Sequence, residues 1–256
     1  MSCQSPPAAR GSRPSRTARR ADAISTEFTG FRPGALGFLV ELSLNNDRSW
    51  FQPRKAEYET LLKEPLERLC TALDQEFRAR EIPLAANPAR SPFRIYRDVR
   101  FSKDKSPYKA NVGASFPWIG EGGGVGGYFH LEPGRAFAGG GMWHPAPARL
   151  AAWRNAVISD RAGVHAVFED PAFTARFGAV DGDRLKRAPA GYGPDDPDLE
   201  LLKLKDVTFG RPLSDEEVLA PDLPVLLAET LGQAVPLLRL LAELPGHESA
   251  ARWLRD

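Results

Sequence analysis

The spacing of apolar residues changes twice along this chain, and the order of the changes restricts the possible folds. Between residues 58 and 77 apolar side chains recur every three or four positions, which is typical of a helix with one buried face. After Pro88 apolar and polar residues alternate, which indicates strands, and from Ala148 the helical spacing returns. Helices, strands and helices grouped in this order predict an α+β fold and not an alternating βαβ fold.

The predicted strands lie close together in the sequence. They span residues 91–101, 109–118, 127–132 and 135–143, and residues 201–209 offer a fifth. Connections this short, including the turn at the end of the third strand, join antiparallel neighbours. We therefore expect an antiparallel β-meander of four to five strands, flanked by N-terminal and C-terminal helices.

Prolines mark where the predicted helices begin or are interrupted. Pro33 favours the first turn of a helix. Pro65 must kink or restart the next helix, because it has no backbone N–H. The most apolar stretch, near the C-terminus, is interrupted by Glu229, Pro236 and Arg239, which favours a core helix over a membrane span. We therefore expect no membrane partner.

Charge is distributed unevenly between an N-terminal tail and the rest of the chain. Residues 1–22 hold five arginines, one aspartate and three prolines, and we predict that they form a disordered tail. Residues 23–256, predicted to form a single α+β domain, carry a net charge of −3, which argues against a basic coat for nucleic acid. Two cysteines make no disulfide framework, so we predict a cytoplasmic protein.

Motifs for metals and cofactors are weak in this sequence. The four histidines do not have the spacing of metal ligands. Residues 122–127 fit the pattern G-x-G-x-x-G, but a strand is predicted to follow them where a dinucleotide-binding loop requires a helix. We therefore expect neither a metal nor an organic cofactor.

The densest group of charges lies in the first predicted strand and the turn after it. Residues 94–109 hold six cations and two anions, a local net charge of +4. On a strand the polar residues at even positions face away from the apolar residues at odd positions. Arg97 falls on the apolar face, so it requires a carboxylate or an anionic ligand there, unless a β-bulge redirects its side chain.

Part of this segment forms a longer motif. The pattern R-x-x-R-D-x-R-F-x-x-x-K-x-x-Y resembles the signature of an uncharacterised family, a domain of unknown function found in bacteria and some fungi. The resemblance extends from about Phe28 to Leu244 and includes the turn at Asn45 and Asn46. It implies that the motif is the functional focus, and it implies no activity. The motif residues are Arg94, Arg97, Asp98, Arg100, Phe101, Lys105 and Tyr108.

The polar face of the predicted sheet favours a pocket for a small anion. Tyr128 and His130 are expected on the same face as Arg94, where Gly113 and Gly139 leave space. Arginines would clamp a phosphate or carboxylate, lysines would add charge, and a tyrosine or histidine could move a proton. The candidate ligand-binding residues are Arg94, Arg97, Asp98, Arg100, Lys103, Lys105, Tyr108, Tyr128 and His130, and no catalytic residue is assigned.

Two other functions fit the same segment. Its charges could form a structural ion-pair network in an interaction module. Alternatively, Tyr96, Phe101 and Tyr108 could stack on the bases of a nucleic acid. The nucleic-acid interpretation is less favoured, because the basic residues occupy one short segment and not a broad stripe. The sequence leaves the reaction, if there is one, and the oligomeric state open.

Overall fold

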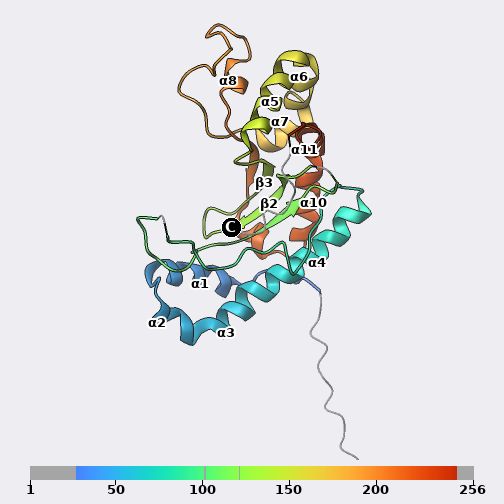
Figure 1. Ribbon diagram of the computed structural model, residues 1–256. Coiled ribbons are helices and arrows are strands. Elements are labelled where there is room, and N and C mark those ends of the chain that lie inside the picture. Colours follow the sequence, from blue (N-terminus) through green and yellow to red (C-terminus); the bar gives the residue numbers. More distant parts are fainter. Residues whose placement is uncertain (1–26, 101, 121, 247–256) are drawn as a thin grey trace, which may run out of the picture.

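The fold is built around one four-stranded antiparallel sheet with helices before, within and after it (Figure 1). The computed structural model describes residues 27–246, apart from residues 101 and 121, so the predicted tail at 1–22 lies outside the described residues. The strands are adjacent in chain order, as predicted for an α+β meander. They are β1 (Val112–Pro117), β2 (Val125–Leu131), β3 (Phe137–Met142) and β4 (Val207–Pro212).

The prediction of a first strand at residues 91–101 is wrong. The described residues 91–100 contain no regular strand and pair with the following segment only at isolated bridges, Pro92 with Ala114 and Tyr96 with Tyr108. These bridges leave residues 93–95 opposite residues 109–113, and the mismatch interrupts the ladder of hydrogen bonds. The predicted fifth strand does form, as β4, and it begins later than expected.

The N-terminal helices follow one another in a single curved run (Figure 1). A π-helical turn lies immediately before Pro65. Because proline cannot donate the usual helical hydrogen bond, this wider turn lets the run continue through it. The elements are α1 (Pro33–Leu44), α2 (Arg48–Phe51), the 3₁₀ turn η1 (Gln52–Arg54), α3 (Lys55–Tyr58), the π turn η2 (Glu59–Lys63) and α4 (Glu64–Ala79).

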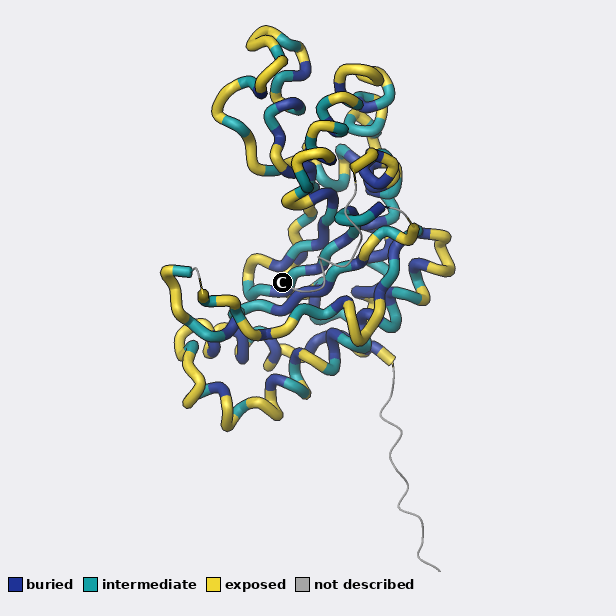
Figure 2. The backbone as a smooth tube through the Cα atoms, viewed as in Figure 1, coloured by how far each residue is buried: buried dark blue, intermediate teal, exposed yellow. Residues whose placement is uncertain are grey.

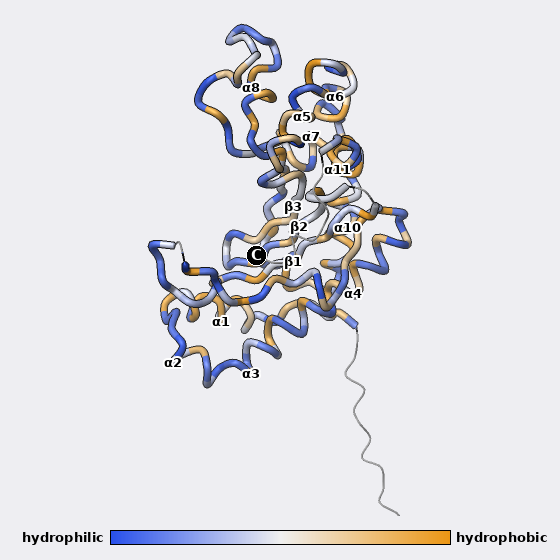
Figure 3. The backbone as a smooth tube through the Cα atoms, viewed as in Figure 1, coloured by the Kyte–Doolittle hydropathy of each residue, from blue (hydrophilic) through white to orange (hydrophobic). Residues whose placement is uncertain are grey.

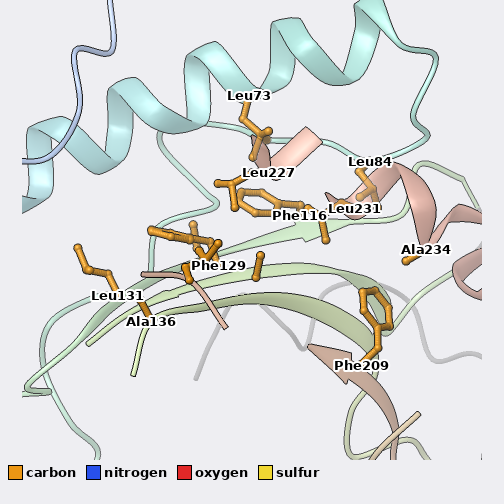
Figure 4. Close-up of a cluster of buried hydrophobic side chains, with 14 of the residues drawn as sticks. Leu73, Leu84, Phe116, Phe129, Leu131, Ala136, Phe209, Leu227, Leu231 and Ala234 are labelled. Carbon is orange, nitrogen blue, oxygen red and sulfur yellow. The ribbon is translucent and has the colours of Figure 1, made fainter. Parts of the chain in front are cut away.

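One face of the sheet is covered by α4 and by two C-terminal helices, α10 (Leu223–Gln233) and α11 (Val235–Ala242). Figure 4 shows Phe116 and Phe129 of the sheet beneath Leu73 of α4 and Leu227 of α10. All four side chains are fully buried. In the described part of the chain no single helix could cross a bilayer; α10 and α11 satisfy length and composition only together, and they are bent by 57°.

The crossover from β3 to β4 carries a helical lobe at the top of Figure 1. Trp153 and Val164 of this lobe are fully buried and belong to the same core cluster as the sheet. Figure 2 shows the exposed backbone concentrated in the loops and on the outer helical turns. The lobe contains α5 (Pro147–Ser159), α6 (Arg161–Phe168), α7 (Pro171–Phe177) and α8 (Leu199–Leu202), and α9 (Asp215–Leu219) follows β4.

The outer face of the sheet, on the side away from α4, has few side chains. Ser115, Tyr128, Gly139 and Gly210 are cross-strand partners in one row, so they share this face. Gly139 and Gly210 contribute no side chain to the row, and Tyr128 is the bulky residue in it. The register therefore places Tyr128 in a row with two glycines.

Candidate anion-binding site

The charged motif forms an irregular hairpin that projects from the edge of the sheet beside α1 (Figure 1). Its two sides are joined by hydrogen bonds from Arg97 N to Pro107 O, 3.0 Å, and from Lys109 N to Ile95 O, 2.7 Å. Nearer the sheet, Phe93 N donates to Gly113 O at 2.9 Å. The hairpin is therefore an extension of the β1 edge.

The expected alternation of side chains survives in this irregular backbone. Ile95 is buried, whereas Arg94, Tyr96 and Asp98 are exposed. Arg97 lies on the inner side, and its side chain is 30% exposed. The carboxylate that Arg97 requires comes from Asp104, across the tip of the hairpin.

Asp104 is held by more than this ion pair. It accepts hydrogen bonds from the Ser106 hydroxyl at 2.6 Å and from the Ser106 backbone N–H at 2.9 Å. These bonds, together with the one from Arg97, keep the pKa of Asp104 far below its usual value. Asp104 is therefore ionised, and it neutralises the charge of Arg97.

Two further candidate cations have partners within the hairpin. Arg100 donates to Asp98 through Nε at 3.0 Å and through Nη2 at 2.6 Å. The hydrogen bonds from Arg100 lower the pKa of Asp98 to about 2. Lys105 donates to the carbonyl oxygen of Val99 at 2.9 Å. These contacts hold the shape of the tip, as the ion-pair-network interpretation anticipates.

Tyr108 joins the hairpin to the N-terminal helices. Its ring is buried and stacks on Phe51, with 4.1 Å between the centroids. Both backbone groups of Tyr108 bind the side chain of Asn46: its N–H donates to Oδ1, and its carbonyl accepts from Nδ2, each at 3.0 Å. Tyr108 is therefore an anchoring residue, and part of it lines the cavity described next.

A polar cavity of about 350 Å³ lies between the C-terminal end of α1 and the hairpin, whose tip and base both contribute residues to it. Most of the residues around it are polar or charged. They are Ser43, Asn46, Arg97, Asp104, Ser106, Tyr108, Lys109, Ala110 and Asn111.

Lys109 is the cation of this cavity that has no carboxylate partner. Its ammonium lies 5.4 Å from the centroid of the Phe93 ring, and the residue is half-buried. Burial, and then the nearby charge of Arg94, lower the pKa of Lys109. Within the described residues, no Asp or Glu oxygen lies within 4.0 Å of a side-chain nitrogen of Lys109, Arg94 or Lys103.

Tyr128 and His130 form a separate hydrogen-bonded chain on the outer face of the sheet. The Tyr128 hydroxyl lies 3.1 Å from His130 Nδ1, and His130 Nε2 lies 3.2 Å from a carboxylate oxygen of Glu132. Burial raises the pKa of Tyr128 to about 12, so the phenol stays protonated and donates a hydrogen bond to Nδ1. His130 then carries its proton on Nε2 and donates to Glu132.

The hydrogen-bonded side chains of Tyr128 and His130 are adjacent to the hairpin through the ring of Phe93. The Phe93 ring makes an edge contact with Tyr128, at 5.9 Å between centroids, and lies beneath the ammonium of Lys109. The Tyr128 hydroxyl also occupies the space above Gly113, where an added Cβ would lie 2.8 Å from it. The hairpin and the Tyr128–His130 pair are thus neighbours through Phe93, and the space expected over Gly113 is filled.

One protein-family model matches most of the chain. The model for a family of conserved hypothetical proteins, DUF2461, matches residues 34–239, which include the hairpin, the sheet and most of the helices. The chain belongs to the DUF2461 family. No curated protein and no solved structure matches it. Membership confirms the family of unknown function that the motif resembles, and it supplies no activity.

In this DUF2461 chain, sequence reasoning missed the cavity residues Lys109, Asn46 and Asn111 as a group. Lys109 follows the motif directly, but its burial depends on the mismatched pairing of 93–95 with 109–113, which alternation does not predict. The sequence pattern places Asn46 in a turn and does not predict its contact with Tyr108. In the described part of the chain, no cluster of three or more His, Cys, Asp or Glu side chains is placed to hold a metal ion.

Proposed function

We propose that this protein binds a small anion carrying a carboxylate or phosphate in the polar cavity at the base of the hairpin. Lys109 is the central cation, and Arg94 is the second. The observation that carries the proposal is that Lys109, a half-buried lysine without a carboxylate partner in the described residues, lines a polar cavity and has a second cation, Arg94, nearby.

The electrostatics of Lys109 support this proposal. A buried ammonium is unfavourable unless an anion or hydrogen-bond acceptors compensate for the lost water. The ring of Phe93 compensates only in part, because a cation–π contact is worth about 1 kcal/mol at a partly exposed site. An anion in the cavity would supply the missing charge and would be attracted by Arg94 as well.

The remaining polar groups of the cavity indicate how an anion would be oriented. Asn111 lines the cavity, and its amide makes no hydrogen bond to another described residue. It can therefore donate to a ligand oxygen next to Lys109. Asp104 lies on the same wall, but its charge is compensated by Arg97 and its oxygens accept from Ser106.

The other candidate residues divide between this site and its support. Arg97, Asp98, Arg100 and Lys105 maintain the tip of the hairpin through their mutual contacts, and Tyr108 anchors its base. In this proposal they are positioning residues. Lys103 is exposed and does not line the cavity, and Tyr128 and His130 lie outside it as well.

The test is a calorimetric titration with inorganic phosphate and with acetate, at constant ionic strength, against chloride. We compare the parent protein with Lys109→Met, which keeps an unbranched side chain one atom shorter and removes its charge. Lys103→Met is the matched control, because Lys103 is an exposed cation of the same hairpin. The proposal predicts binding to the parent and to Lys103→Met, and a loss of at least about tenfold in affinity for Lys109→Met.

Lys109→Met is expected to fold normally, because removing a half-buried charge relieves its desolvation. Equal affinity of Lys109→Met and the parent would contradict the proposal. Absence of binding by the parent to both anions would also contradict it, and would leave the ion-pair network as the function of the motif.

A further inference from the structure

The first helix of the fold exposes an apolar stripe to solvent. Residues 33, 37, 40 and 44 of α1 are spaced along one helical face, and all four are exposed. They are Pro33, Gly37, Val40 and Leu44, and Leu44 is 78% exposed while Val40 is 46% exposed. Glu41 is the single charged residue of α1, and the stripe beside it exposes two aliphatic side chains to solvent.

The segments that adjoin this stripe carry an excess of cations. The segments 32–55 and 94–109 adjoin each other through the contacts of Tyr108 with Asn46 and Phe51, and they form one corner of the molecule, the basic corner. The basic corner holds ten lysines and arginines against four acids, a net charge of +6. The rest of residues 23–256 holds nineteen against twenty-eight, a net charge of −9. Figure 3 shows apolar α1 beside the hydrophilic hairpin.

We propose that the basic corner binds the surface of an anionic lipid membrane. The side chains of Val40 and Leu44 enter the headgroup region, and the cations around them contact lipid phosphates and carboxylates. The negative remainder of the molecule faces away from the membrane, which fixes the orientation. This binding needs no spanning helix, and it is independent of the anion proposed for Lys109. It departs from our expectation of no membrane partner, which considered only spanning segments.

Other partners fit the basic corner less well. A stable protein interface buries roughly 800 Å² on each side and has an aromatic-rich core, whereas this stripe offers two aliphatic side chains. A nucleic acid would satisfy the charges and could stack on Tyr96, which is 47% exposed, but it would leave the aliphatic side chains of Val40 and Leu44 in water. A fluid lipid surface accepts isolated aliphatic side chains and diffuse positive charge together.

The test is sedimentation of the full chain with vesicles of phosphatidylcholine containing about 30% phosphatidylserine, compared with pure phosphatidylcholine. Leu44→Glu places a charge in the stripe, and Lys103→Glu reverses a cation of the corner. Ile158→Glu and Lys186→Glu are matched controls, because Ile158 is 43% exposed on α5 and Lys186 is an exposed cation in the lobe. We expect binding to the anionic vesicles only. Leu44→Glu and Lys103→Glu each weaken it about fivefold or more, and the controls bind like the parent.

Several results would overturn this inference. One is that the parent does not sediment with anionic vesicles. Another is that Leu44→Glu sediments as strongly as the parent, because binding would then come from charge elsewhere, such as the arginines of residues 1–22. A parent that forms a dimer dissociated by Leu44→Glu, without vesicle binding, would assign the stripe to a second copy. Binding to a single-stranded oligonucleotide, again without vesicle binding, would assign the corner to nucleic acid.

Discussion

The side chain of Asn46 joins two parts of the chain that are 62 residues apart. It accepts from the backbone N–H of Tyr108 and donates to the carbonyl of Tyr108, each at 3.0 Å. In the Asn46→Ala variant both backbone groups lose their partners, so we expect the free energy of unfolding to fall by about 1–3 kcal/mol. Urea denaturation measures this loss.

The control for this variant is the neighbouring residue. Asn45 donates to Glu41 O at the exposed end of α1, where water can replace the bond. Asn45→Ala should therefore have the stability of the parent within a few tenths of a kcal/mol. If Asn46→Ala were as stable as Asn45→Ala, the hairpin would not be held by this contact.

At the residue scale, the sequence predicted which way a side chain faces better than it predicted which residues that side chain contacts. The alternation from Arg94 to Asp98 and the pairing of Arg97 with a carboxylate follow from local pattern and the cost of burying charge. The roles of Tyr108 and Lys109 depend on contacts with Asn46 and on the mismatch in the hairpin. These are long-range packing and a local irregularity, and no periodicity contains them.

At the element scale, the pairing of β3 with β4 depends on a glycine. Gly139 and Gly210 are direct cross-strand partners. A Cβ at Gly139 would lie 2.3 Å from the carbonyl oxygen of Phe209, whereas a Cβ at Gly210 would have no neighbour closer than 3.7 Å. We expect Gly139→Ala to cost about 1–3 kcal/mol of stability, because the strands must separate. Gly210→Ala should be neutral or slightly stabilising.

The two glycine variants form their own comparison in thermal melting. Equal melting temperatures for Gly139→Ala and Gly210→Ala would show that the close approach of the strands at Gly139 is absent. The reverse order would contradict the register of β3 and β4.

A second element, α6, is tied to the segment before α8 by a histidine between carboxylates. His165 Nε2 lies 2.6 Å from the buried Asp198, and Nδ1 lies 2.9 Å from Glu169. The hydrogen bond with Asp198, and then the one with Glu169, raise the pKa of His165 above 6.5. The stabilisation is therefore fully present below the unfolded pKa and is lost as the pH rises through the higher folded pKa.

We expect the parent to lose stability relative to His165→Gln, which cannot titrate, as the pH rises from about 6.5 through the higher folded pKa of His165. The difference between the urea midpoints of the two proteins across this range isolates the contribution of His165. A constant difference would mean that the pKa of His165 is the same in the folded and unfolded states, so that its contacts with Asp198 and Glu169 do not raise it.

Most elements could be predicted, because each helix or strand with one buried face has a clear period. α1, α4 and the pairing of β2 with β3 follow from the apolar spacing and the turn at 132–135. The pattern also predicted a regular strand at 91–101, and none forms in the described residues 91–100. The two sides of the hairpin have unequal lengths, and alternation alone contains no information about this.

At the scale of the whole molecule, one core joins the sheet, the N-terminal helices and the lobe. Phe51 of α2, Phe129 of β2 and Trp153 of α5 belong to one cluster of buried side chains. We therefore expect the described residues to unfold in one cooperative step, with coincident transitions by far-UV circular dichroism and tryptophan fluorescence. Separate transitions would indicate that the lobe is an independent unit, against the prediction of a single domain.

The charge of the molecule is organised at the same scale. The basic corner carries a net charge of +6 within residues 23–256, whose net charge is −3. This concentration places Lys109 and Arg94 in a field that favours anions. The central claim is that the cavity beside Lys109 holds one.

Nuclear magnetic resonance of the Lys109 side chain, titrated with and without inorganic phosphate, tests this claim most directly. Without phosphate the pKa of Lys109 should lie below 10.5, because the ammonium is partly buried and faces Arg94. A bound anion favours the charged form, so saturating phosphate should raise the pKa. The account predicts this upward shift, and its absence in Lys103 under the same conditions. A Lys109 pKa that is the same with and without phosphate would contradict it.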